Sequence, residues 1–214
     1  MAPAARFPSV HAPLEDTLDS ARRIVVRQSR DWSELIGVEA ANRYALLTES
    51  GALAGWALEQ PGNWFIRMWL KARRPFEMDV VAGEADQRPA LRLSRPWTFW
   101  FARLEVRDGG GRSLGAIQER FSILRRRFDL VGADGQLLAR LIGPLWKPWT
   151  FLLHPAEGER EVGRIEKRWS GLTSELFTDA DTFLVTLPQS SPALRRLTLA
   201  AAVVIDFKFF ENDE

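Results

Sequence analysis

Four turn signals in the middle of the chain constrain its fold more than any other feature. They are ESG at 49–51, RDGGG at 107–111, ADG at 133–135 and AEGE at 156–159, and such Gly-containing clusters are typical of β-hairpins. Between them, Leu104 and Val106 alternate with charged residues in ARLEVRD, which is the period-two pattern of a half-buried strand. No stretch with the amphipathic period of a helix interrupts residues 44–170. The pattern therefore predicts an antiparallel meander closed into a barrel or sandwich, and it disfavours a parallel α/β fold.

Two sequence blocks recur in the same order within the chain. The blocks are RPWTF (95–99) with LGAIQERFSIL (114–124), and KPWTF (147–151) with VGRIEKRWSGL (162–172). So many matched positions indicate the duplication of a strand–hairpin unit, with the loops absorbing the difference in length. We expect the repeated phrase to mark the start of strands, because Pro followed by aromatic residues often opens an edge or corner strand. Gly115 and Gly163 are expected to begin the return strands, where glycine permits a sharp bend or a bulge.

The C-terminal segment departs from the β pattern. It contains an uncharged run from Leu197 to Ile205, bounded by Arg196 and Asp206. As a helix this run covers roughly 14 Å, whereas the hydrocarbon core of a bilayer is about 30 Å thick. A longer span would bury Asp206 and Lys208, and each charge costs several kcal/mol at the middle of a bilayer. The sequence instead predicts a helix that is apolar on all sides and buried within the protein, for which a closed barrel offers a cavity.

Charge and cysteine content exclude several classes of function. Lys and Arg number 29 against 28 Asp and Glu, so any attraction to nucleic acid or to an anionic membrane must be local. The absence of cysteine excludes disulfides, thiolate metal sites, cysteine nucleophiles and S-acylation. The start of the chain shows neither an apolar leader nor the Met-Gly of myristoylation. We therefore expect an intracellular protein with a flexible tail over residues 1–20 and a single domain over residues 21–214.

Conventional enzyme chemistry finds little support in the residues. His11 and His154 are the two histidines of the chain, so a histidine triad or a histidine metal site has few possible members. The stretch GGGRSLG lacks the Gly-Lys-Ser/Thr ending of a phosphate-binding loop and reads as a hairpin. We expect a protein without a catalytic residue.

Several stretches resemble one known family. The segment VGRIEKRWSGLTSELFTDADTFLVTLP (162–188), followed by AAAVVIDFKFFE (200–211), closely resembles the C-terminal half of phospholipid scramblases, whose domain is similar to the Tubby-like fold. The upstream stretches RIVVRQSRDWSELIGVEAANRYALLTESG (23–51), RRPFEMDV (73–80) and RLSRPW (92–97) also resemble that family. The resemblance implies a closed antiparallel barrel of about twelve strands threaded by a hydrophobic C-terminal helix. It also implies calcium-dependent movement of phospholipids between leaflets, and lipid or DNA binding among relatives.

The proposed calcium motif of that family is degenerate in this chain. It would run from Asp179 to Ser190, whereas an EF-hand loop needs oxygen ligands at positions 1, 3 and 5, Gly at 6 and an acid at 12. Asp179 and Asp181 supply the first two ligands, Leu184 replaces the glycine and Ser190 replaces the final acid. The following apolar residues alternate as in a buried strand: Phe183, Val185 and Leu187. Two interpretations remain, a weak calcium site at the two aspartates or a structural turn that they cap.

The means of membrane attachment must also differ from that of animal scramblases. The resemblance implies that animal scramblases attach to the membrane through a cysteine-rich palmitoylation segment, but the corresponding stretch of this chain, TFWFARLEV, has no cysteine. Aromatic side chains suit a membrane interface, and arginines contribute about 1 kcal/mol each near an anionic surface. The candidate lipid-binding residues are Trp97, Trp100, Trp146, Trp149, Arg125, Arg126 and Arg127. The alternatives are a core role for most tryptophans and, for the arginines at a predicted strand connection, a solvated edge protected by charge.

These observations leave three hypotheses about function. The first is a non-enzymatic scramblase-family protein that binds phospholipid at a membrane surface, at the cytoplasmic face of the plasma membrane, and assists lipid redistribution. The second is a lipid transporter with its C-terminal segment inserted in the membrane, which the short apolar run disfavours. The third is a soluble regulatory barrel that binds a ligand, DNA or a protein. No spaced basic–aromatic array of a nucleic-acid module supports DNA as the partner.

Overall fold

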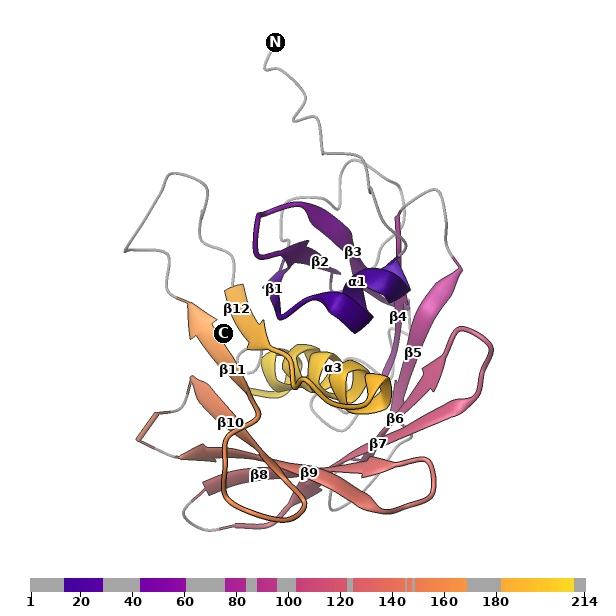
Figure 1. The fold of residues 1–214 in the computed structure, drawn as a ribbon. Helices are drawn as coiled ribbons and strands as arrows, with labels where there is room; N and C mark the ends of the chain where they lie inside the picture. Colours follow the sequence, from indigo (N-terminus) through magenta and orange to yellow (C-terminus); the bar gives the residue numbers. More distant parts are fainter. Residues whose placement is uncertain are drawn as a thin grey trace, which may run out of the picture.

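The computed structural model describes residues 14–28, 43–60, 76–83, 88–95, 103–122, 125–144, 146–147, 149–168 and 182–209. Within these residues, twelve strands form a closed antiparallel barrel (Figure 1). Strands that are consecutive in sequence are neighbours in the barrel, and β1 closes it by pairing with β12. The predicted closed meander of about twelve strands is therefore confirmed.

Each strand is short, as expected for a barrel. The strands are β1 (Arg23–Gln28), β2 (Arg43–Thr48), β3 (Leu53–Glu59), β4 (Phe76–Val81), β5 (Pro89–Arg95), β6 (Arg103–Asp108), β7 (Ser113–Arg120), β8 (Arg125–Gly132), β9 (Leu137–Pro144), β10 (Thr150–Pro155), β11 (Gly163–Arg168) and β12 (Thr182–Thr186). The helices of the described part are α1 (Leu14–Ser20) and α3 (Pro192–Phe209). Inward-facing apolar residues of the strands and of both helices form one continuous core.

All four predicted hairpins are present. They connect β2 to β3, β6 to β7, β8 to β9 and β10 to β11. Each contains a glycine in the left-handed region, with φ between 80° and 91°: Gly51, Gly111, Gly135 and Gly158. Because other residue types adopt this conformation only with strain, the glycines fix where the chain reverses.

The duplicated units correspond to β6–β7 and β10–β11. Gly163 is the first residue of β11, and Gly115 lies near the start of β7 opposite a register shift between Val106 and Arg107. Thr150 of the second phrase begins β10, as predicted. In the first phrase, Arg95 ends β5 rather than opening a strand, and residues 96–102 lie outside the described residues.

The C-terminal helix α3 runs through the middle of the barrel (Figure 1). Leu197 and every residue from Leu199 to Ile205 are at most 7% exposed, and α3 contacts β7, β8, β12 and α1. Thr198 is also buried, and its hydroxyl donates a hydrogen bond to the Leu194 carbonyl oxygen at 2.7 Å. The hydroxyl thus finds its partner within the helix. The predicted buried helix is therefore confirmed. Among the helical residues that the structure describes, no helix has the length and hydropathy needed to cross a bilayer.

The N-terminal prediction needs a correction. A flexible tail was expected over residues 1–20, but Leu14–Ser20 forms α1, and Leu14 and Leu18 are 2% and 1% exposed. These two leucines, one helical turn apart, share a face that packs into the barrel, where Leu14 lies against Gly55 of β3. Two apolar residues in a short charged segment give too weak a periodic signal to predict such a helix. Residues 1–13 lie outside the described residues.

Candidate functional site

The two ends of the barrel differ in their connections. At one end, hereafter the long-loop rim, the strands end or begin at Gln28, Arg43, Glu59, Phe76, Arg95, Arg103, Arg120, Arg125, Pro144, Thr150, Arg168 and Thr182. The connections at this rim are 29–42, 60–75, 96–102, 121–124, 145–149 and 169–181. The opposite end, hereafter the hairpin rim, carries the four predicted hairpins and the β4–β5 connection, together with α1 and the start of α3.

Every candidate residue belongs to the long-loop rim by its place in the chain. Trp97 and Trp100 fall in the β5–β6 connection, and Asp179 and Asp181 fall in the β11–β12 connection; all four lie outside the described residues. Trp146 and Trp149 belong to the β9–β10 connection, and the three arginines begin β8. Among the described residues, the antiparallel topology thus brings Trp146, Trp149 and the start of β8 to the same end of the barrel.

Two aromatic side chains project into solvent at this rim. Phe121 is 76% exposed and Trp146 is 73% exposed, and these are the exposed large hydrophobic side chains of the described residues. Phe121 directly follows β7, and Trp146 comes two residues after Pro144, which pairs with Arg125 of β8. Arg125 is also exposed, so a cationic side chain begins the strand between the two aromatic positions. Exposed aromatics beside a cation are typical of a surface that contacts a membrane interface.

The other described tryptophan of the site has a different environment. Trp149 is half-buried, and the Lys167 ammonium lies 4.9 Å from the centre of its ring and 6.0 Å from that of Phe183. This cation–π contact holds the Trp149 ring beside Lys167 of β11. Trp146 and Trp149 are therefore not equivalent, and only Trp146 presents most of its surface to solvent.

The structure corrects the placement of the three consecutive arginines. They were predicted at a strand connection, but they are the first residues of β8, paired with Pro144, Gly143 and Ile142 of β9. The pleat separates them, because Arg126 lies on the same face as the core residues Phe128 and Leu130, whereas Arg125 and Arg127 lie on the outer face. They do not form one patch.

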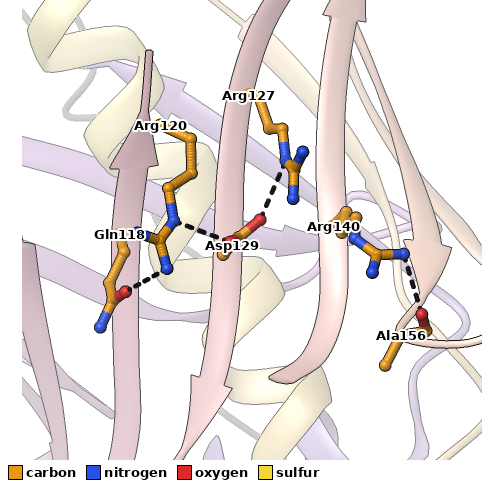
Figure 2. Close-up of polar contacts among 6 residues, drawn as sticks. All are labelled: Gln118, Arg120, Arg127, Asp129, Arg140 and Ala156. Carbon is orange, nitrogen blue, oxygen red and sulfur yellow. Dashed lines mark hydrogen bonds and ion pairs between the residues drawn. The ribbon is translucent and has the colours of Figure 1, made fainter. Parts of the chain in front are cut away.

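The outer face of β7, β8 and β9 holds a second group of arginines (Figure 2). Asp129, which is 5% exposed, accepts hydrogen bonds from Nε of Arg120 at 2.8 Å and from Nε of Arg127 at 3.1 Å. Arg120 also donates through Nη2 to Oε1 of Gln118 at 3.0 Å. On β9, Arg140 pairs in register with Asp129 and donates through Nη1 to the Ala156 carbonyl oxygen at 2.8 Å.

The calcium motif overlaps a barrel strand. Thr182–Thr186, which would be positions 4 to 8 of a twelve-residue loop beginning at Asp179, forms β12 and pairs with both β1 and β11. Phe183, Val185 and Leu187 are buried at 2% exposure or less, as their alternation predicted. A strand held on both sides cannot wrap around a cation as an EF-hand loop does. Elsewhere in the described part, no cluster of three His, Asp or Glu side chains is placed to hold a metal ion.

Sequence reasoning missed Phe121, Arg120 and Asp129. Phe121 occupies the aromatic position of the repeated block, and the sequence pattern carried no signal for its exposure. Asp129 stands between Phe128 and Leu130 in a strand, so alternation places it on the outer face. Only the register, in which Asp129 lies opposite Gln118 of β7, brings Arg120 within reach of it. The signal that the sequence did offer was the negative charge of Asp129, which follows three positively charged arginines.

The fold and the rim together define a class of protein: a closed β-barrel filled by its own C-terminal helix, with an aromatic and cationic surface at one end. The family model described as Scramblase matches residues 2–212. The chain belongs to the Scramblase family.

Curated relatives agree with this family. The chain is 26% identical over 195 residues to a phospholipid scramblase family protein of Schizosaccharomyces pombe, covering 86% of this chain and 50% of the relative. It is 27% identical over 204 residues to phospholipid scramblase 1 of Rattus norvegicus, covering 89% and 60%, and 22% identical over 225 residues to phospholipid scramblase family member 5 of Homo sapiens, covering 98% and 82%. The chain thus spans about half to three-fifths of the first two relatives. No solved structure matches it significantly.

Proposed function

We propose that this protein binds phospholipid at a membrane surface through the long-loop rim and promotes the movement of phospholipid between leaflets without a chemical step. The observation that carries the proposal is the exposure of Phe121 and Trp146 on either side of Arg125. Large aromatic side chains that remain 73–76% exposed gain free energy when an interface covers them. Membership of the Scramblase family and the names of the relatives support phospholipid as the partner.

The proposed orientation follows from the difference between the two rims. The hairpin rim carries α1 and the first turn of α3, whose Arg195 is engaged by carbonyl oxygens of the chain itself. The long-loop rim carries the exposed aromatics. We therefore propose that the barrel approaches the membrane with the long-loop rim first, at the cytoplasmic face of the plasma membrane, while α3 stays inside the barrel.

Liposome flotation tests the proposed membrane surface. We expect the wild-type protein to float with vesicles that contain anionic phospholipid, and we expect Phe121→Ser and Trp146→Ser each to weaken the partition coefficient roughly tenfold, because each removes an apolar side chain from the interface. Arg125→Gln should weaken it about fivefold, for the loss of about 1 kcal/mol of attraction.

Matched variants control for folding and for charge. Phe121→Trp and Trp146→Phe keep an aromatic side chain and should float like the wild type. Arg112→Gln removes an arginine whose side chain is 85% exposed at the hairpin rim, so it should also leave flotation unchanged. Failure of the wild type to float, or equal losses in Arg112→Gln and Arg125→Gln, would rule out binding through the long-loop rim. Salt-sensitive binding of DNA without lipid would instead favour the regulatory barrel.

We further propose that membrane binding does not require calcium, with Asp179 and Asp181 supplying at most a weak site. The pairing of β12 on both sides supports this proposal, because it removes positions 4 to 8 from any ion-binding loop. Flotation is expected to be the same with about 1 mM calcium, a concentration that fills weak EF-hand modules, and with an excess of chelator. A gain of flotation on adding calcium, lost in Asp179→Asn with Asp181→Asn, would contradict this expectation.

A further inference from the structure

In the cluster around Asp129 on the outer face of β7 and β8, the carboxylate is far more buried than its arginine partners. The Asp129 side chain is 7% exposed, whereas the side chains of its partners Arg120 and Arg127 are 51% and 40% exposed. A nearly buried carboxylate thus holds two guanidinium groups that remain half open to solvent (Figure 2). The two arginines come from adjacent strands and pair with each other in register.

Both arginines contact the carboxylate through Nε and so keep terminal nitrogens available. Arg120 uses Nη2 for Gln118, and within the described part of the chain its Nη1 has no hydrogen-bond partner. Among the described residues, no hydrogen bond is found from either terminal nitrogen of Arg127. Guanidinium N–H groups of this kind match the oxygens of a phosphate group in geometry and charge.

The local charge is strongly positive although the chain as a whole is nearly neutral. Four arginines lie on the outer face of β7, β8 and β9 with Asp129 as the neighbouring acid: Arg120, Arg125, Arg127 and Arg140. Four positive charges against one negative charge leave +3 over three adjacent strands, compared with +1 for the whole chain. Such an excess attracts anions to this face.

A second aspartate shows what an ordinary ion pair looks like in this barrel. Asp79 of β4 accepts Nε of Arg92 at 3.0 Å and Nε2 of Gln60 at 3.1 Å. One arginine and one neutral amide leave that group without net charge. The Asp129 cluster differs from the Asp79 group because both of its partners, Arg120 and Arg127, are cationic. One positive charge therefore remains, and a phosphate group would neutralise it.

We propose that Arg120 and Arg127, oriented by Asp129, form a binding site for the phosphate group of a phospholipid headgroup. This inference rests on the proposed function and extends it from the rim to the outer face of the barrel. Asp129 acts as a positioning residue: it restricts two flexible side chains before the ligand arrives, and this lowers the entropy lost on binding. The adjoining Arg125 continues the same face toward Phe121 and Trp146 at the long-loop rim.

The first test uses the wild-type protein and inorganic phosphate. In a titration followed by the Nε–Hε signals of arginine in nuclear magnetic resonance spectra, we expect saturable shifts for Arg120 and Arg127. The signal of Arg92 should move little, because its cluster carries no excess charge. Linear shifts without saturation, or equal shifts at Arg92, would mean general ionic screening and would overturn the site.

The second test compares variants on vesicles of phosphatidylcholine with phosphatidic acid. Arg127→Lys keeps the charge but loses the planar guanidinium, so its affinity should fall about tenfold, whereas Arg92→Lys should stay within about twofold of the wild type. Control vesicles contain oleate, a carboxylate, in place of phosphatidic acid and carry the same total charge. On these vesicles the affinities of the two variants should differ much less. Equal affinities of the two variants on phosphatidic acid would overturn the proposal.

The variant Asp129→Asn tests whether Asp129 orients the two arginines or whether the arginines attract phosphate through their charge alone. If the arginines act only through their charge, removal of the neighbouring carboxylate should strengthen binding to phosphatidic acid. If Asp129 positions them, binding should weaken severalfold although the site becomes more positive. Tighter binding by Asp129→Asn therefore contradicts the positioning role, and thermal unfolding of each variant verifies that it is folded.

These outcomes distinguish the site from the proposed function. If the wild type binds no vesicle but phosphate still shifts Arg120 and Arg127 saturably, the proposed membrane function fails, and a soluble phosphate compound takes the place of the headgroup. If the wild type binds vesicles while phosphate shifts neither arginine and Arg127→Lys behaves like Arg92→Lys, the membrane function stands and the phosphate site is wrong.

Discussion

Replacement of Arg195 by methionine is expected to lower the free energy of unfolding by about 3–5 kcal/mol, the range seen when one partner of a buried charged group is lost. Arg195 is 4% exposed. Its guanidinium donates to the carbonyl oxygens of Leu18 at 3.0 Å, Pro188 at 2.8 Å and Ala21. One side chain therefore joins the end of α1, the segment before β1 and the link from β12 to α3.

The physical reason is the cost of leaving these carbonyl oxygens buried without donors. Leu18 lies in the last turn of α1, whose carbonyl groups have no partner within the helix, and a cation there also complements the helix dipole. Burial lowers the pKa of Arg195, and the charge of Asp19 partly opposes that shift. Methionine fills a similar volume but donates nothing, so up to three acceptors lose their partner.

Thermal unfolding measures this effect, with the neighbouring arginine as control. A loss of 3–5 kcal/mol should lower the melting temperature by roughly 10 °C in a chain of this size. Arg196→Met removes an ion pair of 2.9 Å in which the Arg196 side chain is 14% exposed and the Asp19 side chain 38% exposed. The carboxylate left behind is open to water, so the loss should be clearly smaller than that of Arg195→Met. Equal losses in the two variants would show that Arg195 does not hold α1 and α3 together.

The hairpins and the buried helix could be predicted from the residues because their signals are local, whereas the closed barrel of about twelve strands was implied by the family resemblance. Glycine-containing turns mark the hairpins, and an uncharged run too short for a bilayer marks the buried helix. Both signals depend on residues that are close together in the chain. Helix α1 was missed for the same reason: the burial of Leu14 and Leu18 depends on β3 and α3, which lie far away in sequence.

The candidate site could be predicted only in part, because contacts across strands depend on register. The sequence indicated the arginines of β8 but could not show that Arg126 faces the core while Arg127 meets Asp129. A shift of one residue in pairing would exchange these roles. Likewise, the exposure of Trp146 and the packing of Trp149 against Lys167 follow from the end of β9 and the start of β10, not from residue type.

Introduction of an aspartate in the middle of α3 provides the most severe test of the helix inside the barrel. Ala202 is 0% exposed in the core formed by α3 and the strands. Ala202→Asp should lower the free energy of unfolding by at least about 4 kcal/mol, because the new carboxylate would be buried in the apolar core without a hydrogen-bonding or charged partner. The pKa of that carboxyl should be raised by burial, so the loss should be largest at neutral pH and diminish as the pH falls through the raised pKa.

Ala193→Asp is the matched control, because it makes the same substitution in the half-buried first turn of α3. An acidic residue near the N-terminus of a helix is stabilising, so this variant should be as stable as the wild type or slightly more so. Urea denaturation of both variants without detergent compares the two positions directly. If Ala202→Asp unfolds like the wild type but no longer associates with membranes, α3 acts in the bilayer rather than in the barrel. If it unfolds at much lower urea while Ala193→Asp does not, the apolar run of α3 is the core around which the strands close.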